Sequence, residues 1–435
     1  MGIKVAKFGG TSLADAAQIR KALAIVRSDP DRTYVVVSAP GKRHPGDTKI
    51  TDLLYQLLSN RSGDYQPTLA TIKERYGQIA RDLGVELDLD SYFADIEAHL
   101  TTEPSPAYFA SRGEFLNARL IAACLGWRFL DAAEVIRFSD AGVFQPDETE
   151  ELLEDALHGA GQVVIPGFYG ATAGGIVKTF SRGGSDVTGA LVARAVGASV
   201  YENWTDVSGI LMADPRIVHA PPSIGRISYV ALRELAYMGA SVLHQDAINP
   251  VRHRHIPINI RNTDEPSHPG TWIEPFPRQD PKGPVIMGIA GKPGYAAVTI
   301  HKSQWVGTFG IAWALLRLFA DAKLIVDLAL TGVDTWTMVV PSADLNPVLD
   351  DLLADIARIF TPDTVEVRDD LTLVGVVESG TATRGWVTAR LADALVNAGI
   401  VTHADAFTGD IHVLAVDTAQ YEDAVRAIYT ALVLS

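Results

Sequence analysis

The sequence predicts an α/β domain built on a mainly parallel sheet, followed by two smaller ferredoxin-like units. Short apolar runs alternate with helical patterns through the first half of the chain. A stretch rich in Pro, Asp and Gly then covers residues 262–284, and beyond it the pattern changes to shorter β-α-β-β units. With 435 residues, the chain is long enough for two to four domains.

The strands expected in the first half are compact runs of the kind that is buried in a parallel sheet. They are IKVAKF (3–8), TYVVVSAP (33–40), GQVVIPGFYG (161–170) and ASVYENW (198–204). Helical patterns cover 14–28, 111–126, 183–197 and 228–240. This alternation places helices on both faces of the sheet, and ligands in such sheets bind at the carboxyl ends of the strands.

The domain boundaries follow from changes in composition. We expect a first domain over 1–275, with a helical excursion at about 63–106 whose default role is solvated structure. A linker over 276–284 then leads to a first small unit at 285–360 and a second at 361–435. The two units form a weak internal repeat, and the C-terminal segment is available to complete the first unit.

Composition excludes several classes of function. The chain is 47% hydrophobic and 20% charged, which is typical of a soluble globular protein. Its net charge of −15 argues against a nucleic-acid partner. Cys124 is alone, so no internal disulfide can form, and its apolar surroundings predict a packed core thiol. Lys4 and Lys7 interrupt the first apolar run, so we expect no signal peptide. No stretch is apolar for the ~20 residues of a membrane helix, so we expect no membrane partner, and the single cysteine predicts a cytoplasmic location.

The opening stretch KFGGTS places two glycines directly after a strand. Backbone N–H groups at Gly9 and Gly10 can point at an anion there, although the spacing matches neither a Walker loop nor G-x-G-x-x-G. An ordinary strand-to-helix corner, with Thr11 and Ser12 capping the helix, explains the same residues. The spacing alone leaves both interpretations open.

Three other stretches carry candidate chemistry. In SRGGSD, Ser185 or Asp186 can simply cap a helix, but Arg182 adds donors suited to a carboxylate or phosphate. In TDVSGILMADPR, a strand ends and a turn follows, for which an ordinary Asp-Pro turn is the simpler explanation. Glu114 in SRGE is either a favourable dipole partner at a helix start or a ligand for an ammonium group.

Taken together, these stretches resemble the aspartate kinases. KFGGTS, VVVSAPGK…ITDLL, SRGE, SRGGSD and TDVSGILMADPR occur in that family's order, and the likeness covers residues 2–275 closely. The resemblance implies the three-layer αβα sandwich of the amino-acid kinase superfamily. The C-terminal units more loosely resemble the paired ACT domains of the same enzymes.

The resemblance implies a reaction and a set of site residues. Aspartate kinases transfer the γ-phosphoryl of MgATP to the β-carboxylate of L-aspartate, the first step toward lysine, threonine and methionine. By similarity, the catalytic residues are Lys7, which neutralises phosphoryl charge, and Asp186, which orients the Lys7 side chain. Aspartate would be bound by Ser38, Thr51, Glu114, Arg182 and Ser185, and ATP by Lys7, Gly9, Gly10, Thr205, Asp206, Asp214 and Arg216. Magnesium would be held mainly through ATP, without a metal site of side chains.

The chain departs from the family pattern at a few positions. Leu211 and Ser241 stand where many members carry a tyrosine and a lysine that hold ATP, and Ser181 replaces a glycine. The resemblance also implies a homodimer through the ACT units and a lysine or threonine effector. The candidate effector residues are Trp305, Thr308, Ile311 and Asp327. Structural pairing without effector binding is an equal alternative, because the usual Ser-Glu after the second strand is missing.

Two other functions stay open at this point. One is a related amino-acid kinase that acts on another carboxylic acid, such as glutamate. The other is a non-catalytic amino-acid sensor that kept the fold, which loss of Lys7 or Asp186 would support; the sequence retains both.

Overall fold

A computed structural model describes residues 2–102, 104–181, 183–240, 243, 245–275, 283–305, 310–380 and 384–434. The chain forms two compact units, each described by itself below. The first comprises Met1–Ile210, Gly225–Tyr229 and Val242–Pro277, and the second comprises Leu211–Ile224, Val230–Ser241 and Arg278–Ser435. Among the described residues, none of the helices has both the length and the apolar character that a membrane span requires.

The first unit is built on an eight-stranded sheet in the order β3-β4-β2-β1-β7-β9-β10-β8. Neighbouring strands are parallel except β9 and β10, which confirms the predicted mainly parallel sheet. The strands are β1 (Lys4–Phe8), β2 (Arg32–Val37), β3 (Arg128–Phe129), β4 (Val163–Pro166), β7 (Val200–Thr205), β8 (Arg226–Ser228), β9 (Ile258–Asn262) and β10 (Thr271–Glu274).

Helices cover both faces of this sheet, as the alternating pattern predicts. Ala6 and Phe8 of β1 share a buried cluster with apolar residues of α1 (Ala16–Arg27) and α5 (Pro106–Leu125). Because side chains alternate along a strand, Lys7 faces the opposite side, where α8 (Gly184–Ala195) packs. The result is a three-layer arrangement with Lys7 directed at α8.

The remaining elements of the first unit lie around this sandwich. They are η1 (Thr11–Leu13), α2 (Ile50–Ser59), α3 (Gln66–Leu83), α4 (Leu89–Thr102), α6 (Ala132–Val135), the hairpin of β5 (Tyr169–Ala171) and β6 (Val177–Thr179), α7 (Pro146–Leu157) and α10 (Gln245–Arg252). The excursion at 63–106 contains α3 and α4. It is not merely solvated structure, because α3 buries Ile72, Arg75, Tyr76 and Ile79.

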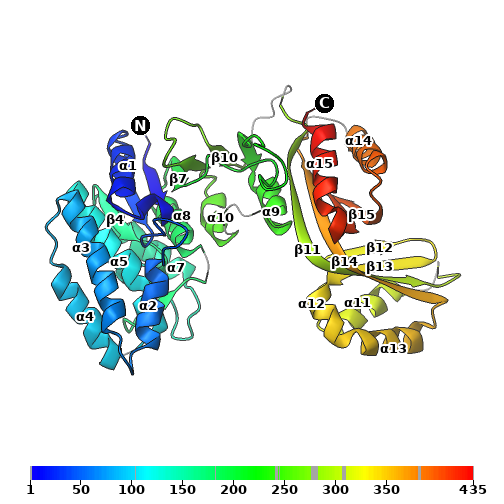
Figure 1. The fold of residues 1–435 in the computed structure, drawn as a ribbon, viewed down its shortest axis with the longest axis horizontal. Helices are drawn as coiled ribbons and strands as arrows, with labels where there is room; N and C mark the ends of the chain where they lie inside the picture. The colour runs from blue at the N-terminus through cyan, green and yellow to red at the C-terminus, as the bar shows by residue number, and fades with distance from the viewer. Residues whose placement is uncertain are drawn as a thin grey trace. The chain divides into compact units, whose positions relative to one another are not determined.

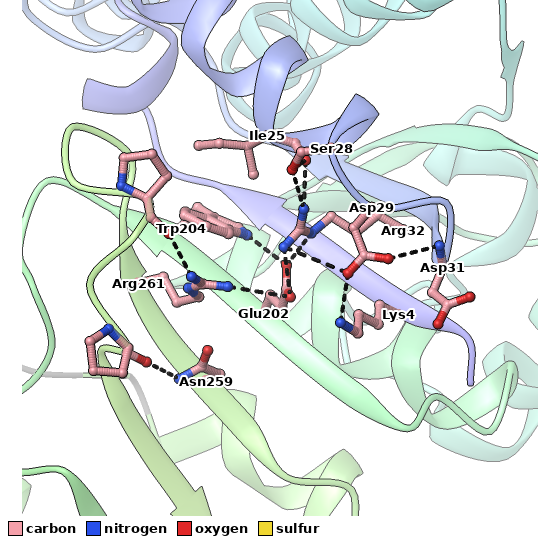
Figure 2. Close-up of polar contacts among 12 residues, drawn as sticks. Lys4, Ile25, Ser28, Asp29, Asp31, Arg32, Glu202, Trp204, Asn259 and Arg261 are labelled. Carbon is pink, nitrogen blue, oxygen red and sulfur yellow. Dashed lines mark hydrogen bonds and ion pairs between the residues drawn. The ribbon is translucent and has the colours of Figure 1, made fainter. Parts of the chain in front are cut away.

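A buried charge network ties the strands of the first unit together away from the Lys7 face. Figure 2 shows the Glu202 carboxylate of β7 among Arg32, Arg261 and Trp204. Arg32 reaches from β2 past β1 and binds Glu202 with two hydrogen bonds of 2.7 and 3.2 Å. The indole of Trp204 donates to the same carboxylate at 2.9 Å. Removing one partner of such a buried pair typically costs about 3–5 kcal/mol, so this network fixes β7 against β1 and β2.

The second unit is built on a six-stranded sheet in the order β12-β13-β11-β14-β16-β15, in which neighbouring strands are antiparallel. Two long strands, β11 (Ile286–His301) and β14 (Thr364–Glu378), run through its centre. The other elements are α9 (Tyr229–Tyr237), whose first residue belongs to the first unit, α11 (Ile311–Asp321), β12 (Leu328–Thr331), β13 (Thr335–Pro341), α12 (Ser342–Leu345), η2 (Asn346–Val348), α13 (Leu349–Phe360), α14 (Arg384–Asn397), β15 (Thr402–Thr408), β16 (Ile411–Asp417), η3 (Thr418–Gln420) and α15 (Tyr421–Leu432).

Each long central strand serves two βαββαβ modules. The second half of β11 pairs with β13 and with the first half of β14, and its apolar side chains pack on α11 and α13. The first half of β11, from Ile286 to Pro293, pairs instead with the half of β14 that continues to β16. Helices α11 and α13 therefore gather at one end of the long strands, and α14 and α15 at the other (Figure 1).

This pairing differs from the expected connection of the two small units. We expected the C-terminal segment to be available to complete the first unit. Instead, residues 286–293 supply the fourth strand of the second module, beside α15. A Cβ added at Gly291 would lie 2.1 Å from the Tyr421 ring, so α15 packs directly on this strand.

Two segments of the predicted 1–275 domain belong to the second unit. The Ile289 N–H donates to the Met212 carbonyl at 2.7 Å, and Gly375 lies against Met238. The compact second unit therefore includes residues 211–224 and 230–241, which the change in composition at 262–284 does not reveal. Most of the expected linker, 276–282, lies outside the described residues.

Candidate active site

The candidate site lies at the carboxyl ends of four neighbouring parallel strands, β4, β2, β1 and β7. Phe8 of β1 is in register with Val37 of β2 and Trp204 of β7, and Val37 is in register with Pro166 of β4. The residues that follow, Gly9, Ser38, Thr205 and Gly167, are therefore aligned along one edge of the sheet. Ligands of open α/β sheets bind at this edge.

Three polar side chains form a closed ring at this edge, of which Lys7 and Asn203 are buried and Asp186 is half-buried. The Lys7 ammonium forms an ion pair with Asp186 Oδ1 at 2.6 Å and donates to Asn203 Oδ1 at 3.4 Å. The Asn203 amide donates to the same Asp186 oxygen at 2.9 Å. Lys7 is only 7% exposed, so its charge is held in a nearly water-free environment. Sequence reasoning paired Lys7 with Asp186 and missed Asn203, whose only signal was a polar residue in a buried strand.

Tight packing of glycines brings Asp186 to Lys7. Gly183 precedes α8 with φ 62°, a left-handed conformation that favours glycine. A Cβ added at Gly184 would lie 2.8 Å from the Phe168 ring, and one added at Gly167 would lie 2.6 Å from the Ser185 Cβ. The glycines of SRGGSD therefore allow the start of α8 to approach the end of β4. Arg182, expected to bind a carboxylate, lies outside the described residues.

The first glycine pair plays a different part from the one expected. The Gly9 N–H donates to the Trp204 carbonyl at 2.9 Å, so it is not directed at an anion and that expectation is wrong. A Cβ at Gly9 would lie 3.6 Å from the Lys7 nitrogen, so the lysine bends back over this glycine. A Cβ at Gly10 would lie 2.9 Å from the Ala39 carbonyl oxygen. Both glycines allow close approach at the end of β1.

Neither hydroxyl residue after the glycines caps the first α-helix. The Thr263 hydroxyl donates to the Ser12 hydroxyl at 2.7 Å, and both side chains are buried. The cap of α1 is Asp15, whose carboxylate accepts from the Gln18 N–H at 2.9 Å. Thr11 is exposed within a short 3-10 turn.

Glu114 is a buried carboxyl group on α5. Burial raises its pKa to about 8, although a hydrogen bond from the Ala39 backbone acts in the opposite direction. Its Oε2 atom is buried and has no hydrogen-bond partner among the residues that the structure describes. A Cβ at Gly113 would lie 2.7 Å from the Ala39 Cβ, so the helix packs against the residues that follow β2.

The three hydroxyl residues expected to bind aspartate lie near these groups to different degrees. Ser38 donates its N–H to the Phe8 carbonyl at 3.1 Å, and its own carbonyl accepts from Asn117 at 2.7 Å. Ser185 is buried against Gly167. Thr51 is in the first turn of α2, next to Ile50, which flanks Gly113. The end of β2 therefore positions Ser38, the first turn of α8 positions Ser185, and Thr51 comes from α2.

The residues expected on the ATP side fall into two groups. Thr205 ends β7 at the same edge as Lys7, and its hydroxyl donates to the exposed Asp206 carboxylate at 3.1 Å. Asp214 and Arg216 belong to the second unit. There the Arg216 guanidinium binds the Asp214 carboxylate, and its hydrogen bonds lower the pKa of that group. Leu211 is in the same unit, and Ser241 lies outside the described residues.

Two of the candidate effector residues are already engaged within the second unit. Trp305 is a core residue whose ring packs edge-on against Phe360 at 6.1 Å. Asp327 accepts hydrogen bonds from the hydroxyls of Tyr237 and Tyr295 and forms an ion pair with Lys292 at 3.4 Å. Both side chains therefore already have partners within this unit, which an effector would have to displace.

The other two effector candidates add little. Ile311 begins α11 and packs partly on the core, and Thr308 lies outside the described residues. Within the described ranges, no group of three or more His, Cys, Asp or Glu side chains is arranged to hold a metal ion.

Comparison with known proteins agrees with the geometry. Residues 2–262 match the amino acid kinase family. The chain is 34% identical over 450 residues to aspartokinase 3 of Bacillus subtilis, covering 98% of both chains. It matches the crystal structure of Clostridium acetobutylicum aspartate kinase with a TM-score of 0.90 and 39% identity, covering 99% of this chain and 100% of that one.

Escherichia coli aspartokinase III is a more distant relative. Its complex with aspartate and ADP (R-state) gives a TM-score of 0.72 at 24% identity, and its complex with lysine and aspartate (T-state) gives 0.71 at 25%. Each covers 99% of both chains. Family match, full-length identity and the Lys7 site agree, and the chain belongs to the aspartate kinases of the amino acid kinase family, with a C-terminal regulatory region.

Proposed function

We propose that the chain transfers the γ-phosphoryl group of ATP to the β-carboxylate of L-aspartate at the Lys7 site. The observation that carries this proposal is the ring of Lys7, Asp186 and Asn203 at the carboxyl edge of the sheet. It presents one buried ammonium where a phosphoryl group would lie between a nucleotide and an acid. The product is 4-phospho-L-aspartate, with ADP as the leaving group.

Catalysis at this site rests on positioning and charge. An oxygen of the aspartate β-carboxylate attacks the γ-phosphorus, and the bond from that phosphorus to the β,γ-bridging oxygen breaks. The nucleophile is already ionised, so no general base is needed. Lys7 neutralises charge on the phosphoryl oxygens, which is the main form of stabilisation in phosphoryl transfer. Asp186 and Asn203 hold two of the ammonium's donor directions and leave the third for the phosphoryl group.

Aspartate binding is assigned to the side of β2 and α5. Glu114 has a buried oxygen that no described residue contacts by a hydrogen bond, and we assign it to the substrate ammonium. Ser38 and Ser185 lie at the ends of neighbouring elements, and Thr51 approaches from α2. We assign Arg182 to the substrate α-carboxylate because a guanidinium binds a carboxylate with two parallel hydrogen bonds.

Nucleotide binding is assigned to the side of β7. Thr205 and Asp206 would contact adenosine, and the start of α8 offers backbone N–H groups and a positive helix dipole to phosphate. Asp214 and Arg216 are assigned to the phosphates through the resemblance alone. Magnesium, when bound, would be held mainly through ATP rather than by side chains of this chain, and it would reduce the negative charge of the phosphates.

The second unit is proposed to be regulatory and to form a homodimer. Lysine is the first effector to test, because it is named with aspartate in the Escherichia coli aspartokinase III complex. Threonine is the second. An effector ammonium reaches Asp327 only by displacing Lys292 or a tyrosine hydroxyl. We also propose a cytoplasmic location, on the grounds of the single cysteine, and a role in lysine and threonine biosynthesis.

An ATP-dependent hydroxamate assay tests the proposal, because hydroxylamine traps acyl phosphates. Aspartate should give hydroxamate, whereas glutamate should not. Activity with glutamate alone would indicate a related amino-acid kinase. No activity with either acid would leave an amino-acid sensor as the function.

A further inference from the structure

The helical excursion contributes a buried arginine to the surroundings of the site. Arg75 of α3 is 5% exposed. Its guanidinium donates to the carbonyls of Gly41, Thr48 at 2.9 Å and Ala14 at 3.4 Å. It also forms an ion pair with Asp47 at 3.2 Å. One side chain thus contacts residues of two different loops.

These two loops are the ones that leave the site edge. Residues 9–15 follow β1 and carry Gly9 and Gly10, and residues 38–49 follow β2 and carry Ser38. The Gly41 N–H donates to the Gly10 carbonyl at 2.7 Å, so the loops are bonded to each other. The second loop then leads into α2, which carries Thr51 in its first turn.

We propose that Arg75 is a positioning residue for the active site, which holds both loops in the geometry that substrate binding requires. The role rests on the proposed function, because the loops matter through Gly10, Ser38 and Thr51. Arg75 itself touches neither substrate. Its partners are three backbone carbonyls and one carboxylate, so it acts on the path of the chain.

A guanidinium suits this task better than any other side chain. It is planar, always charged, and offers five donors in a fixed arrangement. Carbonyls from two loops and the Asp47 carboxylate can therefore be bound at once. Asp47 stays ionised beside it, since hydrogen bonds from Arg43 hold the pKa of Asp47 well below its usual range.

The neighbouring residue on α3 makes a second contact of the same kind. Tyr76 is fully buried, and its hydroxyl donates to the Gly113 carbonyl at 2.7 Å, directly before Glu114. Adjacent residues of α3 thus support the loops and the helix that carries the buried carboxyl group. Helix α3 therefore holds these loops and α5 in position beside the site, which is a structural role that a purely solvated helix would not have.

Replacement of Arg75 by alanine tests the proposal, with Arg81→Ala as the matched control. Arg81 is on the same helix, but its side chain is 60% exposed and it bonds to Glu74 and Gln78. We expect Arg75→Ala to lower kcat/KM for aspartate by about 10²-fold, with a rise in the aspartate KM as part of the loss. Millimolar guanidinium should restore part of this loss by filling the vacated space. Arg81→Ala should show neither the loss nor the rescue.

Amide hydrogen exchange separates this role from the proposed function. In Arg75→Ala, exchange should accelerate in 10–15 and 40–49 and stay unchanged in β7, whether or not aspartate is the substrate. An inactive wild-type enzyme would overturn the proposed function, and unchanged exchange in both loops would overturn the role of Arg75. If Arg75→Ala does not fold, Arg75→Lys replaces it in both measurements, because it keeps the charge and loses the fork. Wild-type kcat/KM in a folded Arg75 variant would also overturn the proposal.

Discussion

Each compact unit contains a lysine–aspartate pair, and the two pairs differ in what they leave available. In the first unit, the contacts of the Asp186 carboxylate with described residues all go to Oδ1, from Lys7 and Asn203. In the second unit, both oxygens of Asp327 are engaged, Oδ1 by Tyr237 and Oδ2 by Tyr295 and Lys292. The Lys292 ammonium also lies 4.6 and 5.1 Å from the centres of the two tyrosine rings.

The difference shows that an ion pair indicates a reactive site only when one of its groups can still form a hydrogen bond with a ligand. Lys7 lies beside a glycine at the open edge of a parallel sheet, with one donor direction unassigned. Both carboxylate oxygens of Asp327 accept hydrogen bonds, and these bonds connect α9 and β11 to the loop before β12. The first pair is therefore interpreted as catalytic and the second as structural. The predictions below test that distinction.

The largest expected effect is the loss of the ammonium in the first pair. Lys7→Ala should lower kcat by about 10²- to 10³-fold, because it removes charge stabilisation from the transition state. Lys292→Ala should leave kcat unchanged. Steady-state assays of both variants, with circular dichroism to confirm folding, make the comparison. Wild-type turnover in Lys7→Ala would refute the catalytic assignment.

The second effect concerns Glu114, the buried carboxyl group whose Oε2 atom has no hydrogen-bond partner within the described ranges. Its pKa is raised to about 8 by burial, so it is mostly protonated at neutral pH before aspartate binds. If its ionised form receives the substrate ammonium, kcat/KM for aspartate should rise with pH, by about tenfold per unit well below pH 8. Glu114→Gln should remove this rise. A rise that persists in Glu114→Gln would assign it to another group.

The same carboxyl group affects stability, with a sign that follows from its raised pKa. Between about pH 4.5 and pH 8 the folded state binds the proton more tightly than the unfolded state. The free energy of unfolding should therefore fall as the pH rises through this window, by at most about 1.4 kcal/mol per pH unit. Urea unfolding at several pH values should show a smaller slope for Glu114→Gln. An identical slope would contradict the raised pKa.

A smaller effect is expected from Asn203, which distinguishes the Lys7 pair from the Lys292 pair. Asn203→Leu removes the amide oxygen that accepts from Lys7 and the amide N–H that donates to Asp186, while keeping a similar volume. We expect kcat to fall by about tenfold, with KM for both substrates nearly unchanged, because the ammonium loses its orientation. A change confined to KM would show that Asn203 contacts substrate instead.

The sequence was sufficient for the elements and motifs that depend on nearby residues. Strand and helix patterns predicted the parallel sheet, and the glycines of KFGGTS and SRGGSD marked the ends of elements near the site. Lys7 and Asp186 were paired through the resemblance, and they do form an ion pair. The elements and turns depend on spacing within short stretches, whereas the Lys7–Asp186 pair was predicted only through the family resemblance.

The features that sequence reasoning missed depend on contacts between distant parts of the chain. Asn203 matters because β7 pairs with β1 in the register that aligns it with Lys7. The same pairing of β1 with β7 extends to Trp204, whose carbonyl accepts the Gly9 N–H. Arg75 binds mostly backbone carbonyls, which leave no signature in the sequence of their residues. The engagement of Asp327 likewise requires Tyr237, 90 residues away.

The smallest expected effect concerns regulation through the second pair. If lysine inhibits the enzyme by binding at Asp327, its ammonium competes with that of Lys292. Lys292→Ala should then lower the lysine concentration for half-inhibition by about fivefold. Arg358→Ala is the control, because Arg358 is an exposed cation of the same unit that pairs with Asp355. Equal lysine sensitivity in wild type, Lys292→Ala and the control would place any effector site away from Asp327, and the two lysine–aspartate pairs would then differ in kind, one catalytic and the other purely structural.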